Sequence, residues 1–186
     1  NDFDIADVCN AVCDKMIFRH PHVFGTGDAK TASQVENNWE KIKMKEKDGN
    51  KSVLSGVPSA LPSLIKAYRI QDKARNVGFD WENREQAWSK VREEFEELMV
   101  EIQNMDPQKQ EDEFGDLLFS LINCARLYKI NPDNALESTN AKFIRRFNYL
   151  EEKTIKKGID LKSISLDDMN NIWNEAKQLE KEGKLK

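Results

Sequence analysis

The chain has 186 residues, of which 39% are hydrophobic and 33% are charged, a composition that suits a soluble protein built from amphipathic helices. The net charge of -4 argues against a general nucleic-acid-binding protein, and no apolar run approaches the roughly 18 residues that a membrane-spanning helix needs. Three cysteines cannot form a full set of disulfides, so we expect reduced thiols and a cytoplasmic protein with no membrane or nucleic-acid partner.

Apolar residues recur at helical spacing along most of the chain, and no alternating strand pattern runs for long. The first helix is expected over residues 4–19, because the residue before Pro21 disfavours the helical region. A loop over 25–28 follows, and further helices are expected over residues 31–47, 59–76, 84–104, 107–129, 133–156 and 166–181. Several helices with short connections and no strands predict an all-α helical bundle.

Capping residues mark the start of several predicted helices. Ser59 can cap the helix over 59–76, and Asn83 can cap the one that follows it. Ser165 with Asp168 resembles a capping pair for the last helix. Gly56-Val57-Pro58 is the clearest boundary signal, so residues 48–58 are interpreted as a linker.

Two acidic clusters on neighbouring helices are the most informative feature: Glu93-Glu94-x-x-Glu97 and Glu113-x-x-Asp116. On a helical wheel, Glu94 and Glu97 lie beside an apolar seam, and the two acids of the second cluster do the same. The seams consist of Trp88, Val91, Phe95, Leu98 and Ile102 on one helix, and of Phe114, Leu117, Leu121, Ala125 and Tyr128 on the next. Because the connection between the helices is short, they should pack antiparallel and bring four carboxylates face to face.

Carboxylates held together beside an apolar core repel one another and lose hydration, and a divalent cation is the simplest remedy. An all-oxygen ligand set favours Mg²⁺ or Mn²⁺, whereas di-iron bundles use Glu-x-x-His pairs. Both histidines lie in His20-Pro21-His22, outside the acidic helices, and lack partners for a zinc site. On this pattern alone, solvated acidic helix faces remain an open alternative.

Basic residues follow the acidic helices. Lys142, Arg145 and Arg146 lie on the next helix, with the first and last of them one turn apart, and Lys90 precedes the acidic stripe by one turn. Such cations can bind the phosphates of a triphosphate, Arg by a bidentate grip, although an exposed basic face is equally compatible with the pattern. Trp173 on the last helix could stack on a base or be a core residue.

Together these motifs resemble the MazG family of nucleoside triphosphate pyrophosphohydrolases. The similar segments, in chain order, are Asn76-Val77-Gly78-Phe79-Asp80-Trp81, Lys90-Val91-x-Glu93-Glu94-x-x-Glu97, Glu113-x-Gly115-Asp116-Leu117-Leu118-Phe119, Asn123-x-Ala125-Arg126, Lys142-Phe143-x-Arg145-Arg146-Phe147 and Trp173. In addition, Arg19-His20-Pro21-His22-Val23-Phe24 resembles the end of a first module, and Lys15-x-x-x-Arg19 repeats the spacing of Lys142 and Arg146. The resemblance implies a remnant of an N-terminal MazG module over 1–30, a helix and linker over 31–58, and a complete C-terminal catalytic module over 59–186.

The resemblance also implies a chemistry. Mg²⁺, with Mn²⁺ as a substitute, would be held by Glu94, Glu97, Glu113 and Asp116. Water would attack the α-phosphorus of a nucleoside triphosphate and release a nucleoside monophosphate and pyrophosphate. The implied catalytic residues are Glu93, which would position or deprotonate the water, and Glu94. The implied substrate contacts are Lys90, Lys142 and Arg146 to the phosphates, Trp173 to the nucleoside, and Asn123 to the base or sugar.

The resemblance further implies a helical bundle completed by dimerisation. Two other functions remain open at this point. One is a non-catalytic helical interaction module whose acidic stripe binds a basic partner. The other is a related all-α dUTPase with the same acidic residues and a uracil-specific pocket.

Overall fold

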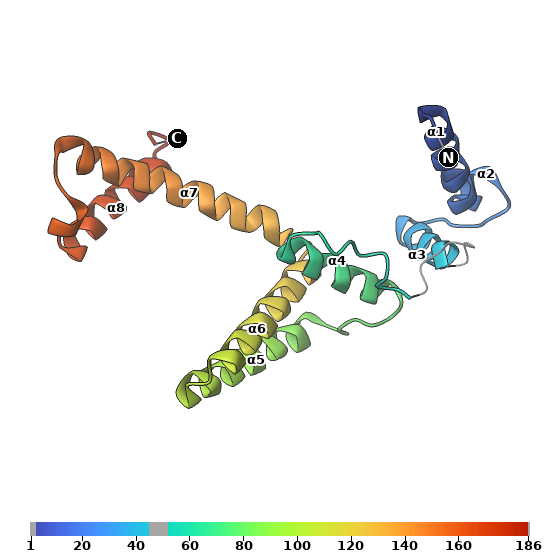
Figure 1. Cartoon of the computed structure of the whole chain (residues 1–186), viewed down its shortest axis with the longest axis horizontal. Helices are drawn as coiled ribbons and strands as arrows, with labels where there is room; N and C mark the ends of the chain where they lie inside the picture. Colours follow the sequence, from blue (N-terminus) through green and yellow to red (C-terminus); the bar gives the residue numbers. More distant parts are fainter. Residues whose placement is uncertain (1–2, 45–51, 186) are drawn as a thin grey trace. The chain divides into compact units, whose positions relative to one another are not determined.

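The computed structural model describes residues 3–44 and 52–185. Every regular element within them is helical, which confirms the predicted all-α class (Figure 1). None of the described helices is long and apolar enough to cross a membrane. The helices are α1 (Ile5–Arg19), α2 (Pro21–Phe24), α3 (Ala32–Met44), α4 (Ser63–Asn76), α5 (Arg84–Asn104), α6 (Pro107–Leu127), α7 (Pro132–Lys153) and α8 (Leu166–Lys181), with short 3-10 turns η1 (Ile155–Lys157) and η2 (Leu161–Ser163).

Two of the three predicted caps are present. Asn83 accepts a hydrogen bond from the N–H of Gln86 (2.9 Å) at the start of α5. Ser165 accepts one from the N–H of Asp168 (3.1 Å) at the start of α8. These side-chain oxygens satisfy backbone N–H groups that have no partner inside the helix. Both caps are therefore confirmed.

The predicted start of α4 at Ser59 is wrong. The helix begins at Ser63, and Pro62 occupies the N-cap position with ψ of 143°. Because a proline disfavours the helical region for the residue before it, Pro62 prevents a helix that runs through Leu61. The predicted end of the second helix beyond residue 44, and residues 48–51 of the predicted linker, lie outside the described residues.

Two helices end earlier than the pattern predicted. The helix expected over 107–129 ends at Leu127, and the one expected over 133–156 ends at Lys153. In the second case the chain tightens into η1 before Gly158, whose φ of +78° is readily adopted by glycine. Such differences are small because the last turn of a helix is often 3-10.

The chain divides into two compact units, residues 1–129 and 130–186, and each is described by itself. In the first unit, α5 and α6 form a hairpin through a turn at Met105 and Asp106 (Figure 1). Asp106 caps α6 by accepting hydrogen bonds from two backbone N–H groups. The buried centre of this unit consists of Ala87, Val91 and Cys124, with Leu117 and Leu127 packed against it.

Helix α4 is joined to the hairpin by a hydrogen bond from the Gln71 side-chain amide to the backbone carbonyl of Phe119 (2.7 Å). Farther along the hairpin, the Gln110 amide donates to the carbonyl of Glu101 (3.1 Å). Near the start of the same unit, the Arg19 guanidinium lies over the ring of Trp39, 5.0 Å from its centroid.

The predicted apolar seams are only partly buried. Val91 and Leu98 are in the core, whereas Trp88, Phe95 and Ile102 are 39%, 52% and 46% exposed. The buried face of α5 is rotated toward Ala87 and Glu94, because α6 packs on that side. The helical wheel located the apolar stripe but placed its centre wrongly, and several large apolar side chains of the hairpin are exposed among the described residues.

In the second unit, α7 and α8 pack together around Leu150 and Ala176, which are buried. Ion pairs connect the two helices: Lys153 contacts Glu175 at 3.1 Å, and Arg145 contacts Glu180 at 3.0 Å. The α7–α8 pair thus has its own small core and its own polar connections.

Candidate functional site

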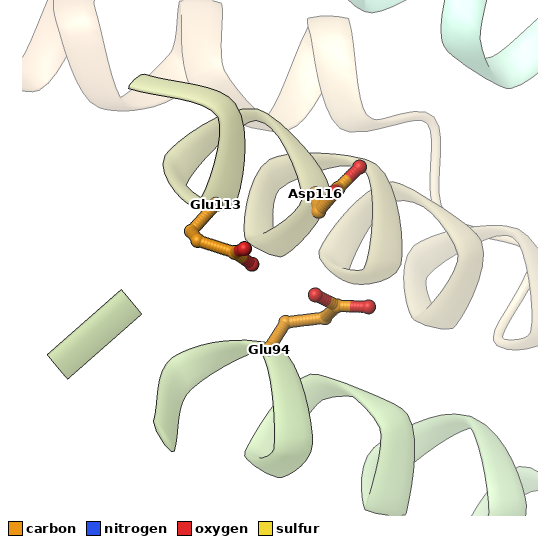
Figure 2. Close-up of side chains that lie close together, drawn as sticks. All are labelled: Glu94, Glu113 and Asp116. Atoms are coloured by element: carbon orange, nitrogen blue, oxygen red, sulfur yellow. The ribbon is translucent and has the colours of Figure 1, made fainter. Parts of the chain in front are cut away.

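Three carboxylates converge on the α5–α6 hairpin. Glu94 comes from α5 and Glu113 and Asp116 come from α6, with the Glu113 side chain directed toward Glu94 (Figure 2). Each supplies a carboxylate oxygen, and these oxygens all lie within 4.8 Å of one another. Glu94 is only 6% exposed, so its charge is largely removed from water. The hairpin therefore brings together acids from both predicted clusters.

Glu97 lies outside this group of three, one turn farther along α5. Lost hydration and the charge of Glu94 raise the pKa of Glu97, and Glu113 adds to the effect. Nearby carboxylates disfavour the charged form of an acid in this way. Glu97 is therefore repelled by the charges of the acidic cluster, although its own carboxylate oxygens lie outside the cluster.

Lys90 lies one turn before Glu94 and offsets part of the negative charge. Its ammonium lies 2.6 Å from a carboxylate oxygen of Glu93 and 2.7 Å from one of Glu94. Hydrogen bonds to Glu93 and then to Glu94 raise the pKa of Lys90 well above its usual value. Glu93 thus faces Lys90 rather than the three clustered acids, and its side chain is 55% exposed.

The donor set fits a hard divalent cation. Carboxylate oxygens on two helices can share one ion, and the described cluster offers no sulfur or imidazole ligand. A single lysine cannot neutralise three crowded carboxylates, so an added dication would relieve their repulsion. The metal predicted from the sequence therefore has a plausible set of protein ligands in Glu94, Glu113 and Asp116.

A cavity of about 590 Å³ adjoins the acids within the first unit. Its wall includes Lys90, Glu94 and Asp116 at one side, and the predicted contact residue Asn123 lies farther along α6. The remaining lining residues are mostly apolar or aromatic: Leu54, Ile70, Gln71, Ala74, Phe79, Asp80, Trp81, Ala87, Phe119, Ser120 and Arg126. Ligand pockets commonly have this size and this combination of apolar walls with a few polar groups.

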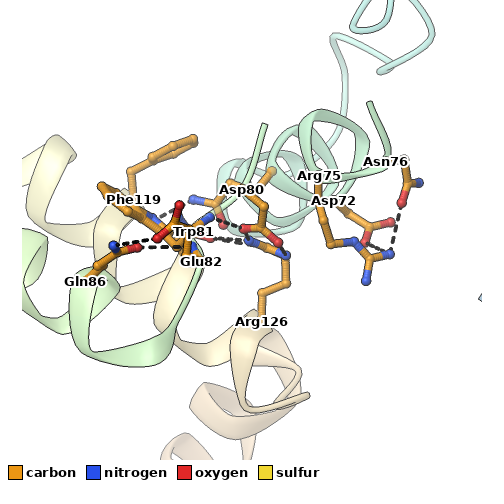
Figure 3. Close-up of polar contacts among 11 residues, drawn as sticks. Asp72, Arg75, Asn76, Asp80, Trp81, Glu82, Gln86, Phe119 and Arg126 are labelled. Atoms are coloured by element: carbon orange, nitrogen blue, oxygen red, sulfur yellow. Dashed lines mark hydrogen bonds and ion pairs between the residues drawn. The ribbon is translucent and has the colours of Figure 1, made fainter. Parts of the chain in front are cut away.

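A partly buried ion pair lies in the wall of the cavity. Arg126 on α6 is 7% exposed and binds both carboxylate oxygens of Asp80, which lies in the loop before α5 (Figure 3). The same guanidinium donates to the side-chain oxygen of Asn123 (3.2 and 2.7 Å). Partial burial raises the pKa of Asp80, but hydrogen bonds from Arg126 and from the N–H of Trp81 outweigh it and lower the pKa overall.

This network has no signature in the sequence pattern. Asp80 and Arg126 occur within motifs that resemble the MazG family, and Gln71 belongs to none of the motifs. A lone Asp in a loop and a lone Arg on a helix carry no periodic signal, so only their contact in space reveals the pair. The Asn123 side-chain oxygen accepts hydrogen bonds from Arg126, and its contact with a ligand stays a prediction.

The remaining predicted residues belong to the second unit. Arg146 donates to Glu180 (2.8 Å), as does Arg145 (3.1 Å), and hydrogen bonds from Arg146 in particular lower the pKa of Glu180. Trp173 packs against Phe143, with ring centroids 5.1 Å apart. A second cavity of about 510 Å³ is lined by Lys142, Arg145, Arg146, Lys177, Glu180, Lys181 and Leu185. Two of the three predicted phosphate-binding cations, Lys142 and Arg146, thus lie at this cavity of the α7–α8 unit, whereas Lys90 lies in the first unit.

Comparison with known proteins shows which family the chain belongs to. Residues 1–24 and 82–150 match the model of the MazG nucleotide pyrophosphohydrolase domain. A nucleoside triphosphate pyrophosphohydrolase of Escherichia coli is 38% identical over 182 residues, which cover 96% of this chain and 69% of that protein. The chain belongs to the MazG family. The matched segments include both acidic MazG motifs, and the family assignment made from the motifs is confirmed.

Other MazG relatives extend the comparison. The nucleoside triphosphate pyrophosphohydrolase/pyrophosphatase MazG of Thermotoga maritima is 39% identical over 176 residues, covering 94% of this chain and 66% of that protein. The uncharacterized protein YabN of Bacillus subtilis is 46% identical over 182 residues, covering 96% of this chain and 37% of that protein. All three relatives are longer than the segment that they share with this MazG chain.

Proposed function

We propose that this MazG protein hydrolyses nucleoside triphosphates at the α–β phosphoanhydride to a nucleoside monophosphate and pyrophosphate. The observation that carries the proposal is the cluster of Glu94, Glu113 and Asp116 at the edge of a ligand-sized cavity. Membership of the MazG family and the names of its relatives support the same reaction.

Mg²⁺, with Mn²⁺ as a substitute, is the proposed cofactor, held by the three clustered acids with Glu97 as the fourth ligand. When bound, such an ion polarises phosphoryl oxygens and lowers the pKa of a coordinated water. The all-carboxylate donor set supports a hard cation of this kind. Glu97 completes the set after a side-chain rearrangement, since its oxygens lie outside the group of three.

The chain's own residues supply the remaining steps. We assign Glu93 to orient the attacking water and take its proton, while the bond between the α-phosphorus and the bridging oxygen breaks and pyrophosphate leaves. Lys90 neutralises charge on the substrate phosphates. Its ion pairs with Glu93 and Glu94 hold the Lys90 ammonium beside these acids. A phosphate that binds next to the acids would therefore also interact with this ammonium, which supports the assignment.

We assign Lys142 and Arg146 to the outer phosphates and Trp173 to the nucleoside. The gathering of Lys142, Arg145, Arg146, Lys177 and Lys181 around one cavity supports the phosphate assignment. The Glu180 carboxylate occupies the N–H groups of Arg145 and Arg146, so a phosphate must displace it or use the free edges of the side chains. The packing of Trp173 on Phe143 leaves it half-buried, with part of its ring available.

A homodimer is the proposed assembly. Phe95, Ile102, Phe114 and Leu118 of the α5–α6 hairpin are each more than two-fifths exposed, which is unusual for so many large apolar side chains on one pair of helices. A second copy of the hairpin could cover them. The division into an N-terminal remnant, a linker and a catalytic module over 59–186 stays a prediction, as does the cytoplasmic location, for which three free cysteines give support.

The test is a pyrophosphate-release assay on ATP, GTP, CTP and UTP with and without Mg²⁺. We expect magnesium-dependent release of pyrophosphate, not orthophosphate, and loss of activity in Glu94→Gln. Glu96→Gln is the matched control, because that acid lies on the same helix, is exposed and is outside the cluster. Release of orthophosphate, or full activity of Glu94→Gln, would refute the proposed reaction or ligand.

A further inference from the structure

One acid lies among the cations that line the second cavity. Five basic side chains and a single carboxylate line this cavity of about 510 Å³ in the α7–α8 unit. The carboxylate belongs to Glu180 on α8, and its side chain is 13% exposed. Hydrogen bonds from Arg146 outweigh the loss of hydration and, with those from Arg145, lower the pKa of Glu180, so the acid is ionised at neutral pH. Such a charge opposes the binding of anions in the same cavity and therefore requires an explanation.

Glu180 contacts two guanidinium groups of α7 at once. Its Oε1 accepts a hydrogen bond from Nε of Arg145 at 3.1 Å, and Nη2 of that arginine lies 3.0 Å away. Its Oε2 accepts one from Nε of Arg146 at 2.8 Å, and Nη2 of that arginine lies 2.7 Å away. Each arginine therefore turns the same edge of its guanidinium to a separate carboxylate oxygen. Because a guanidinium is planar and rigid, contact along one edge also fixes the direction of the opposite edge.

The contact with Glu180 does not use the Nη1 edge of either guanidinium. A guanidinium has N–H groups on all three of its nitrogens, and Glu180 takes only those along the edge of Nε and Nη2. An edge formed by the two terminal nitrogens can bind a phosphate bidentately. Arg146 is held from another side as well, since its guanidinium lies 5.9 Å from the centroid of the Trp173 ring. Both arginines are thus oriented before any ligand binds.

Holding α8 against α7 does not require an acid inside the cavity. A second carboxylate, Glu175, connects the same two helices, because it accepts a hydrogen bond from the Tyr149 hydroxyl (2.6 Å) and lies 3.1 Å from the Lys153 ammonium. Glu175 is 49% exposed and is not among the residues that line the cavity. The unit therefore contains an interhelical ion pair of the same kind outside the cationic cavity, so the location of Glu180 points to a further role.

We propose that Glu180 is a positioning residue for phosphate recognition, which orients Arg145 and Arg146 so that their Nη1 edges bind a polyphosphate group in this cavity. This role rests on the nucleotide-hydrolysing function proposed above and adds a residue that acts through the arginines rather than on the substrate. The cavity stays strongly cationic, because five positive side chains and one negative side chain give a net charge of +4. Side chains that are ordered in advance lose less conformational freedom on binding, which favours a tighter complex.

Positioning and simple charge repulsion predict opposite effects of Glu180→Gln. If the carboxylate acts only as a charge, its removal from a cationic cavity should strengthen anion binding. If Glu180 orients the arginines, binding should weaken, because the amide has one acceptor oxygen for two guanidinium groups and its nitrogen only donates. The sign of the change in affinity therefore distinguishes the two roles.

Calorimetry with inorganic pyrophosphate in metal-free buffer measures this change without turnover. Glu180→Gln should weaken binding by at least about 5-fold, the loss expected when two guanidinium groups must be ordered during binding. Glu180→Asp keeps the charge but is one methylene shorter, so it should also weaken binding, and it carries the test if Glu180→Gln does not fold. Glu175→Gln is the matched control, because it removes the interhelical ion pair outside the cavity, and it should leave the affinity unchanged.

A lysine background separates orientation from a general effect on the unit. With both Arg145→Lys and Arg146→Lys in place, Glu180→Gln should no longer weaken pyrophosphate binding, because an ammonium is a point charge without an edge to orient. Thermal unfolding of each variant checks that it is folded at the temperature of the measurement.

Four results would refute the positioning role. The wild-type protein does not bind pyrophosphate, Glu180→Gln strengthens binding or leaves it unchanged, Glu175→Gln weakens it equally, or the effect of Glu180→Gln persists in the lysine background. Each of these results is compatible with normal pyrophosphate release from nucleotides. Absence of that release in the wild-type protein would instead refute the proposed function.

Discussion

The Asp80–Arg126 pair should contribute strongly to the stability of the first unit. The Arg126 side chain is 5% exposed and that of Asp80 is 21% exposed. The charge left behind is therefore more buried when Asp80 is replaced than when Arg126 is replaced. Asp80→Asn leaves the more buried guanidinium without a counter-ion and should cost about 2–3 kcal/mol, near the lower end for breaking a buried ion pair. Arg126→Met leaves a carboxylate that reaches water and should cost about 1–2 kcal/mol.

The double variant should cost only about 2 kcal/mol, because neither charge is then left alone. The two single costs and the double cost together give a coupling energy of about 2 kcal/mol. Urea unfolding followed by tryptophan fluorescence measures it, with Trp173→Phe as the background so that the remaining tryptophans lie within residues 3–129. High salt should reduce the coupling only in part, since the Arg126 side chain is buried while the Asp80 carboxylate reaches water.

A surface pair provides the control for this cycle. Lys109 and Glu101 lie 3.9 Å apart in the same unit, and the lysine side chain is 61% exposed. Their coupling should be below about 1 kcal/mol and should fall with salt. Additive costs for Asp80→Asn and Arg126→Met, with a coupling no larger than in this control, would refute the view that the buried pair holds the loop.

Further predictions concern metal affinity, pH and local backbone structure. Glu113→Gln should weaken Mn²⁺ binding by at least about 10-fold in calorimetry. Replacing even a residue that only hydrogen-bonds to a metal ligand often lowers metal affinity by about this factor. Arg146 holds the pKa of Glu180 below 4.5. The stability that this pair contributes is therefore present above pH 4.5 and is lost as the pH falls through the lowered pKa. Glu180→Gln should make the free energy of unfolding depend less on pH in the acid range. Met105 has φ of +57°, a left-handed conformation that strains a residue with a side chain. Met105→Gly removes this strain, which exceeds the additional backbone entropy that glycine loses on folding. The variant should therefore be more stable by about 0.5–1 kcal/mol in thermal unfolding.

Local signals predicted the helices well because each one depends on nearby residues. Asn83 and Ser165 cap backbone groups within one turn, and their effect can be read from sequence spacing alone. Pro62 could have been read the same way, but Ser59 was favoured as a cap although the proline follows it closely. The misplaced start of α4 is therefore an error of interpretation rather than missing information.

The candidate site was predictable where two helices are forced together. The short connection at Met105 and Asp106 fixes α5 against α6, which is why three of the four predicted ligands meet. The position of Glu97 was harder to predict. A helical wheel gives the angles of side chains around one helix axis, but not how that helix is rotated about its axis relative to the neighbouring helix. That same rotation explains why Phe95 is exposed while Glu94 is buried.

The cavity could not be predicted from the sequence because its walls come from several separate segments. Gln71 lies on α4, Asp80 in the following loop and Arg126 at the end of α6, and their contacts depend on tertiary packing. Helix propensity describes each helix by itself, whereas the cavity walls are defined by how the helices pack together.

Anomalous diffraction from a crystal grown with Mn²⁺ tests the central claim most directly. We predict a single strong peak about 2.0–2.2 Å from carboxylate oxygens of Glu94, Glu113 and Asp116, with the cavity open beside it. A peak bound elsewhere, with these three side chains directed separately into solvent, would contradict the metal site and the hydrolytic function built on it.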